Sequence, residues 1–298
     1  MLESFKMAYV ILCHKNPEQI NMLIDSLTND SVEFFLHVDQ KSGIEGDITH
    51  RNDIHFVKEP IDVRWGHYSQ IECVLKCFAL IKEHGKFNYI HIISGQDLPL
   101  ASNEVILDFF KKNQGNEFVK HLQLPNTSET WGCYERVSVY YPRFLISRTR
   151  RMAAIRMRYI KAVMNVPFLH RRLGVLPKSL YKGSNWMSIT GECMEYIMEF
   201  TSTSPEYVRF FKNTLCGDEI FFHTIILNSG FKNNVRSEIK RYTDWETGPD
   251  YPRTLTIEDY DRITSTGTEC FWGRKFDLDI DRSIVQDLLD INTKVKTS

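Results

Sequence analysis

The chain has 298 residues, of which 42% are hydrophobic, and it carries 37 Lys and Arg against 38 Asp and Glu. This length can bury a large core, and the balanced charge gives no basic footprint for nucleic acid, so we expect no nucleic-acid partner. No apolar run is long enough to span a bilayer, and residues 1–6 lack the apolar region of a signal peptide. Seven scattered cysteines show no zinc-site spacing. We therefore expect a cytoplasmic protein with reduced thiols.

Apolar runs of strand length alternate with helical patterns in the first part of the chain. Strands are predicted at residues 7–13, 33–38, 54–58 and 87–93, and helices at residues 17–27, at 68–81 and from Asn103 onward. Strands that alternate with helices predict an α/β fold, with a mostly parallel sheet flanked by helices. Further helices are predicted at 190–200 and from about Ile284.

Polar clusters follow three of the predicted strands: His14-Lys15-Asn16, Asp39-Gln40-Lys41 and Ser94-Gly95-Gln96-Asp97. In open α/β sheets, ligands bind beyond the carboxyl ends of the strands. The clusters together predict a crevice for a nucleotide or a sugar nucleotide in the first ~115 residues. Taken singly, each cluster is ordinary loop chemistry. No G-x-G-x-x-G and no P-loop is present, which disfavours dinucleotide and ATP binding.

Two adjacent carboxylates, Asp218 and Glu219, begin an apolar segment that runs to Leu227. The segment predicts a helix that is apolar over almost its whole circumference and therefore buried. A carboxylate at the first turn is suited to act as a general base at the edge of a dry site. Alternatively, the pair caps a core helix and interacts with its dipole. The residues alone favour the capping interpretation.

A strongly basic stretch lies between residues 137 and 191, which contain no Asp or Glu. Within residues 143–178, Arg and Lys are interleaved with Met, Ile, Tyr and Val in an amphipathic pattern. One interpretation is contact with an anionic membrane surface or another polyanion. The other is a solvated basic helix that covers the core. The pattern supports both interpretations equally.

Nine segments resemble, in order, the core-2/I-branching β-1,6-N-acetylglucosaminyltransferase family, which also contains the peptide O-xylosyltransferases. They are AYVILCHKN (8–16), FFLHVDQKS (34–42), VRWGHYSQIE (63–72), YIHIISGQDLPL (89–100), KGSNWMSIT (182–190), GDEIFF (217–222), RYTDW (241–245), PRTLT (252–256) and GRKFDLDID (273–281). The resemblance implies one GT-A-like catalytic domain over residues 1–298. Its nucleotide-binding half would be residues 1–115 and its acceptor and catalytic half residues 116–298, with the basic stretch 143–178 as an insert.

The resemblance also implies an inverting transferase that uses a UDP-sugar donor and needs neither a divalent metal nor another cofactor. The catalytic carboxylate falls on Glu219, and the two cations that bind the diphosphate fall on Arg253 and Lys275. Fixed cations can neutralise a departing diphosphate, as Mg²⁺ or Mn²⁺ does in other enzymes. Asp-x-Asp sequences within Asp277–Asp281 are interpreted as caps of the last helix, not as metal ligands.

Further roles follow from the same match. Uridine and donor contacts are expected from Asp39, Trp65, Ser94, Gly95, Gln96 and Asp97, and acceptor contacts from Glu135, Asp218 and Trp245. An indole can pack on the C–H face of a sugar, and carboxylates can bind paired hydroxyls. For both tryptophans, a structural position in the core is the alternative.

The family uses UDP-N-acetylglucosamine, UDP-xylose or UDP-glucuronic acid, and transfer of N-acetylglucosamine is the leading prediction. Its relatives in animal secretory pathways carry an anchor, a stem and disulfides, none of which is evident in this sequence. We therefore expect a bacterial enzyme that extends a glycan, such as a lipid-linked or surface-polysaccharide precursor, at the inner face of the membrane. The alternatives are a metal-dependent transferase, a non-catalytic nucleotide-sugar-binding module, and an interaction protein that uses its basic segment.

Overall fold

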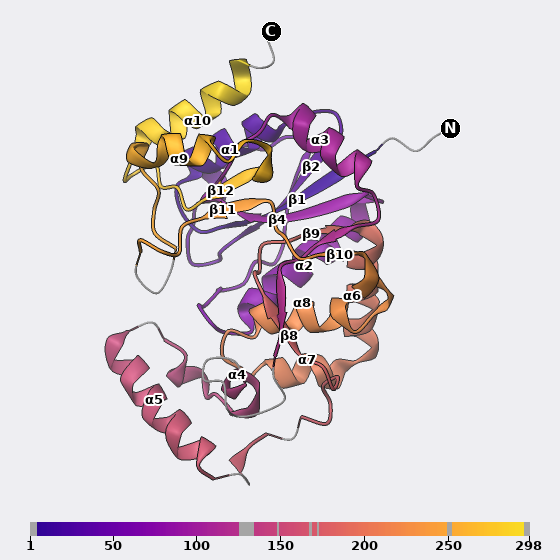
Figure 1. Cartoon of the computed structure of the whole chain (residues 1–298), viewed down its shortest axis with the longest axis vertical. Helices are drawn as coiled ribbons and strands as arrows, with labels where there is room; N and C mark the ends of the chain where they lie inside the picture. The colour runs from indigo at the N-terminus through magenta and orange to yellow at the C-terminus, as the bar shows by residue number, and fades with distance from the viewer. Residues whose placement is uncertain are drawn as a thin grey trace.

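The computed structural model describes residues 5–124, 134–147, 149–166, 169–171, 173–248 and 252–294. A twisted central sheet lies in the middle of the molecule and helices cover both of its faces (Figure 1). The predicted α/β class is therefore confirmed.

The central sheet has seven strands in the order β10-β6-β9-β4-β1-β2-β3. Four neighbours, β3, β2, β1 and β4, run parallel, whereas β9 is antiparallel to both β4 and β6. The bounds of the strands are β1 (Met7–Cys13), β2 (Val32–Val38), β3 (Ile54–Phe56), β4 (Tyr89–Ser94), β6 (Glu117–Phe118), β9 (Ser188–Thr190) and β10 (Val235–Arg236). Because β6, β9 and β10 join this sheet, the sheet crosses the predicted division at residue 115.

The alternation of side chains along β1 explains the two apolar layers. Ala8 and Val10 pack on one face of the sheet, whereas Tyr9 and Ile11 pack on the other. Five helices cover these faces: α2 (Ser69–His84), α6 (Gly191–Thr203) and α8 (Asp218–Leu227) on the first, and α1 (Pro17–Leu27) and α3 (Asn103–Lys112) on the second. Since both faces are buried, β1 is a continuous apolar run.

A three-stranded sheet brings the C-terminal part of the chain to the end of β4. It contains β11 (Arg241–Thr243), β12 (Trp272–Arg274) and β5 (Asp97–Pro99). In the antiparallel pair β12–β5, Arg274 lies opposite Asp97. The last helix, α10 (Arg282–Lys294), packs beside β5 and α1, close to its predicted start.

The predicted basic helix is confirmed as α5 (Arg150–Met164), which lies away from the sheet at the lower left of Figure 1. Short elements that the sequence patterns did not predict are α4 (Glu135–Ser138), α7 (Pro205–Phe211), α9 (Tyr260–Thr264), β7 (His121–Gln123) and β8 (Tyr181–Gly183). In the part of the chain that the structure describes, no helix has the length and apolar character needed to cross a bilayer.

Candidate active site

A cavity of about 600 Å³ opens beyond the carboxyl ends of β1, β2 and β4. His14 and Asp39, which follow β1 and β2, and Ser94, the last residue of β4, all line it. In the sheet, β2 pairs with one edge of β1 and β4 pairs with the other edge. The cavity therefore lies at the point where the strand order reverses. The predicted convergence of the three polar clusters is confirmed.

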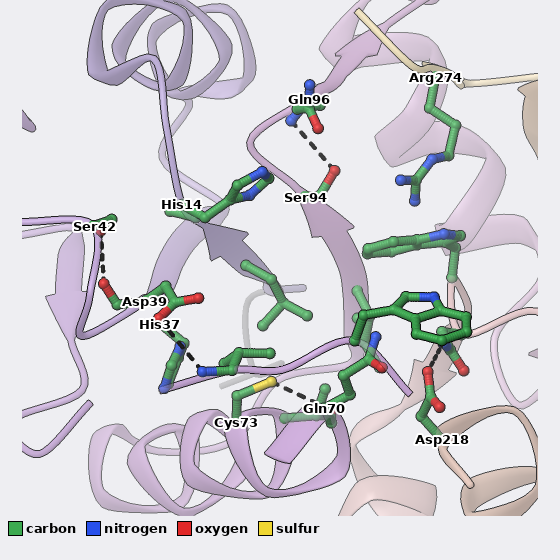
Figure 2. A pocket seen from close by; sticks show the side chains of 18 of the residues that line it. His14, His37, Asp39, Ser42, Gln70, Cys73, Ser94, Gln96, Asp218 and Arg274 are labelled. Atoms are coloured by element: carbon green, nitrogen blue, oxygen red, sulfur yellow. Dashed lines mark hydrogen bonds between the residues drawn. The ribbon is translucent and has the colours of Figure 1, made fainter. Parts of the chain in front are cut away.

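Asp39 lies on one side of the cavity, next to His14 (Figure 2). Its carboxylate is buried and pairs with Lys41 Nζ at 3.1 Å, and its Oδ1 accepts a bond from the backbone amide of Val63 at 3.4 Å. Nearby, His37 Nε2 accepts a hydrogen bond from the backbone amide of Ile61 at 3.1 Å. Burial lowers the pKa of His37, which favours the neutral ring that this bond requires. These bonds hold residues 61–63 in place before Trp65, which also lines the cavity.

The Ser94–Asp97 loop closes the end of β4 with an internal hydrogen-bond network. Ser94 donates to Asp97 through its amide at 3.2 Å and its hydroxyl at 2.8 Å, and the Gln96 amide donates to Ser94 Oγ. Ser94 and Gln96 line the cavity, while Asp97 is buried behind them. A Cβ at Gly95 would lie 2.8 Å from Ile20 Cγ1, so the close approach at this glycine is to helix α1.

Arg274, the last residue of β12, and Lys275 after it also line the cavity, and Arg274 lies across the cavity from Asp39 (Figure 2). The guanidinium of Arg274 lies over the ring of Trp186, 3.9 Å from its centroid, and its Nε is 3.7 Å from Asp97 Oδ1. The Arg274 atoms Nε and Nη1 are buried and make no hydrogen bond in the structure. Burial lowers the pKa of Arg274, with Asp97 opposing this effect, and a guanidinium remains charged. A buried cation with unused donors, facing a cavity, is suited to bind an anion.

Asp218 lines the same side of the cavity as Arg274 (Figure 2). Its Oδ2 accepts a hydrogen bond from Asn185 Nδ2, while its buried Oδ1 makes none. Burial raises the pKa of Asp218 to about 7, and Glu219 adds to this effect while Asn185 opposes it. Gly217 is the N-cap residue of α8 and no side chain caps the helix. The carboxylates therefore do not cap the helix, but both lie in its first turn, where the predicted interaction with the helix dipole applies.

Glu219, one residue further along α8, points to a different surface. Its side chain is 37% exposed, it pairs with Arg136 Nη1, and it does not line the cavity in the described part of the chain. Arg136 belongs to α4, whose first residue is the buried Glu135. Glu219, the predicted catalytic residue, lies on α8, and Glu135, a predicted acceptor residue, lies on α4. The ion pair between Arg136 and Glu219 joins these two helices.

The two predicted diphosphate ligands are not brought together. Lys275 lines the cavity, but Arg253 does not, because the Arg253 guanidinium is held by Asp244 at 2.8 Å and by Asp259. Arg274 occupies the position beside Lys275 instead. Trp245, the predicted acceptor platform, is 62% exposed, so its alternative as a buried structural residue is wrong.

Comparison with known proteins identifies the family. A family model described as Core-2/I-Branching enzyme matches residues 7–264. The chain belongs to the core-2/I-branching enzyme family. This confirms the predicted family, and the parallel sheet flanked by helices fits the GT-A-like fold that the family implies.

Curated relatives of this core-2/I-branching enzyme are distant. The chain is 21% identical over 292 residues to the mouse β-1,3-galactosyl-O-glycosyl-glycoprotein β-1,6-N-acetylglucosaminyltransferase 4, covering 91% of this chain and 58% of that protein. It is 23% identical to bovine xylosyltransferase 2 (95% of this chain, 33% of that protein). It is 21% identical to the xylosyltransferase oxt of Drosophila pseudoobscura pseudoobscura (91% and 31%). The relatives are glycosyltransferases, in agreement with the predicted enzyme class, and the chain spans only part of their length.

The Asp-x-Asp sequences of this chain lie in two different environments. Asp281 accepts bonds from the backbone amides of Ser283 at 3.0 Å and Ile284 at 3.3 Å, so it caps α10 as predicted. Asp277 instead accepts bonds from Lys15 and Asn16 after β1. Within the described ranges, no group of three or more His, Cys, Asp or Glu side chains is arranged to hold a metal ion.

Several residues that line the cavity were not predicted individually, among them Asn185, Trp186 and Arg274. Asn185 and Trp186 lie in KGSNWMSIT and Arg274 lies in GRKFDLDID, two of the segments that carry the resemblance. Arg274 could have been suspected from its place next to Lys275. Asn185 could not, since only the folded chain shows that it binds Asp218 across 33 residues.

The raised pKa of Asp218 predicts a pH dependence of stability. An unfolded Asp ionises near pH 4, whereas Asp218 in the folded enzyme ionises at about 7. Between these values the folded state holds a proton that the unfolded state has released, so this group's contribution to the unfolding free energy falls as the pH rises. Asp218→Asn should therefore become more stable relative to the parent from about pH 4 to pH 8, as measured by urea unfolding. A difference that stays constant over this range would contradict the buried, protonated state.

Proposed function

We propose that this chain is an inverting, metal-independent glycosyltransferase. It would transfer N-acetylglucosamine from a UDP-linked donor to a hydroxyl of a glycan. The observation that carries the proposal is a cavity lined both by two adjacent cations, Arg274 and Lys275, and by the buried carboxylate of Asp39.

The donor fits the cavity by size and by chemistry. Nucleotide and drug-sized ligands occupy cavities of roughly 300–1,000 Å³, and this one measures about 600 Å³. Asp39 and the Ser94 and Gln96 side chains supply hydrogen-bonding groups for the uridine, and Trp65 supplies a flat apolar wall. Asp97 does not line the cavity, but it contacts two residues that do: it accepts a hydrogen bond from Ser94 and lies beside Arg274.

The reaction needs a proton acceptor and a way to stabilise the leaving group. We assign the proton acceptor to Glu219 from the resemblance to the family, and its carboxylate would have to leave Arg136 Nη1 and turn toward the cavity to act. There it would take the proton of the acceptor hydroxyl, whose oxygen forms a bond to the anomeric carbon as the bond to the diphosphate breaks. The bonding electrons leave with UDP, and the negative charge that develops on it is stabilised by Arg274 and Lys275. These fixed cations support the proposal that no divalent ion is required. Arg253 would join them only after leaving Asp244 and Asp259.

The acceptor would approach from the side of Glu219. Trp245 offers an exposed indole to the C–H face of a sugar, and Glu135 lies on the helix that pairs with Glu219. The unused Oδ1 of Asp218 can accept a bond from a sugar hydroxyl at the reaction centre.

UDP-xylose is the second candidate donor, and the matched xylosyltransferases favour it. The name xylosyltransferase describes those relatives, and both donors share the uridine diphosphate that the cavity would bind. For the acceptor we keep the glycan of a bacterial lipid-linked or surface-polysaccharide precursor as the proposal.

Release of UDP from a panel of UDP-sugars tests this function. We expect turnover, or slow hydrolysis without an acceptor, for one donor, with UDP-N-acetylglucosamine first and UDP-xylose second. Calorimetry with UDP alone separates binding from turnover. Binding of UDP without turnover of any donor would favour a non-catalytic binding module, and absence of both would refute the proposal.

A further inference from the structure

The outer face of α5 is rich in cations that lie outside the proposed active site. Arg150, Arg151, Arg158 and Lys161 are all exposed, and residues 137–191 contain no acidic residue that could neutralise them. The opposite face of α5 is anchored by Ile160 and Val163, which are buried against Val139 and Tyr141. The packing of Ile160 and Val163 holds the helix to the protein, but it does not account for the cations on the exposed face.

Apolar side chains are exposed around these cations. Ile155 and Met157 on α5 are 41% and 45% exposed, Phe144 before the helix is 73% exposed, and Leu169 after it is 49% exposed. At 100° per residue, Arg158 and Arg151 lie near the centre of the outer face, with Ile155 toward one edge and Met157 toward the other. We define this basic–apolar face as Phe144, the exposed residues of α5 and Leu169.

We propose that the basic–apolar face of α5 docks on the surface of a bilayer that contains anionic lipids. A cationic helix face flanked by exposed apolar side chains matches both layers of such a surface: anionic headgroups and the acyl region just below them. A soluble acidic glycan would satisfy the cations but would leave Phe144, Ile155 and Met157 without an apolar partner. The inference goes beyond the proposed function and does not depend on it.

The docked orientation would put the cavity close to the membrane. Arg156, on the anchored side of α5, donates to the carbonyls of Leu145 at 3.1 Å and Ser147 at 2.9 Å. Its guanidinium also lies over the ring of Trp65, 5.7 Å from the centroid, and Trp65 lines the cavity. The same helix therefore contacts the active-site wall with one face and offers cations with the other, which would suit an acceptor carried on a lipid.

Flotation of the full chain with lipid vesicles tests the inference without any enzymatic activity. We expect binding to phosphatidylcholine vesicles that contain phosphatidylglycerol, little binding to phosphatidylcholine alone, and weaker binding as salt is raised. The triple variant Arg151→Glu, Arg158→Glu, Lys161→Glu should bind anionic vesicles roughly a hundredfold more weakly or worse, since each surface cation contributes about a factor of five.

A matched control makes the same change of total charge elsewhere. The exposed residues Lys58, Lys82 and Lys86 lie outside α5, and their replacement by Glu should leave vesicle binding close to that of the parent. A second variant, Phe144→Ser with Met157→Ser, should weaken the binding that remains at high salt. Far-UV circular dichroism and thermal unfolding of the same preparations check that the variants are folded and keep this test separate from the proposed function.

Three results would overturn the inference: no binding of the parent to anionic vesicles, equal binding by the α5 triple variant, or equal loss in the Lys58, Lys82 and Lys86 control. Competition with dextran sulfate, a soluble polyanion, is a further measurement. A parent that binds dextran sulfate through α5 but does not float with vesicles would show that the face recognises soluble polyanions, and the membrane inference would be wrong.

Discussion

Arg274→Ala is expected to lower kcat/KM for the preferred UDP-sugar by about 100- to 1,000-fold, the usual effect of losing one preorganised donor to a developing charge. The side chain is buried with two unused donor atoms at the cavity wall, and alanine supplies no donor in their place. Lys275→Ala should cause a loss of similar size, since Lys275 lines the same wall. Steady-state kinetics and UDP calorimetry measure both effects.

Arg274→Lys tests whether the planar donors of arginine are needed in addition to its positive charge. Lysine keeps the positive charge but loses the planar donors and the stacking on Trp186, so it should recover only part of the activity. Lys58→Ala, an exposed change, is the control and should be neutral. A different outcome would contradict this role for Arg274: the kinetics of the parent in Arg274→Ala, and loss of turnover in Arg253→Ala. Arg253, as the resemblance implies, would then be the cation that binds the diphosphate.

Glu219→Gln is expected to lower kcat by about 100- to 10,000-fold and to leave the affinity for UDP essentially unchanged. Glutamine has the shape of glutamate and can still accept a bond from Arg136, but it cannot accept the proton of the acceptor hydroxyl. Single-turnover kinetics with saturating acceptor measures the chemical step directly.

Asp218→Asn provides the comparison, because Asp218 is the carboxylate that actually lines the cavity. If Asp218 only binds and orients the acceptor, this variant should mainly raise the acceptor KM. An inactive Asp218→Asn beside a nearly normal Glu219→Gln would reassign the base to Asp218. The pKa of about 7 for Asp218 would then predict a kcat that rises through neutral pH.

The core of the fold could be predicted from local patterns. The apolar run at residues 7–13 and the Pro17 helix start gave β1 and α1 with the bounds seen in the structure. The strand ends then located the cavity, because parallel strands place their carboxyl ends on one edge. These features depend on near neighbours along the chain, which sequence patterns report well.

Contacts between distant segments could not be predicted in this way. Nothing local shows that β12 pairs with β5, which puts Arg274 opposite Asp97, or that Arg253 is engaged by Asp244 and Asp259. Adjacent residues can also serve different surfaces: Asp218 and Glu219 differ by about 100° around α8, so one enters the cavity and the other meets α4. The resemblance to the family placed some residues on the cavity wall, such as Asp218 and Lys275, but Glu219 and Arg253 do not line it. The partner of each side chain required the structure.

Fixed cations in place of a divalent ion are the central claim, and the most direct measurement is the rate of UDP release from the preferred donor after exhaustive treatment with EDTA. The account predicts an unchanged rate in EDTA, no gain from added Mg²⁺ or Mn²⁺, and a severe loss in the Arg274 and Lys275 variants under the same conditions. A rate that vanishes in EDTA and returns with Mn²⁺ would contradict it.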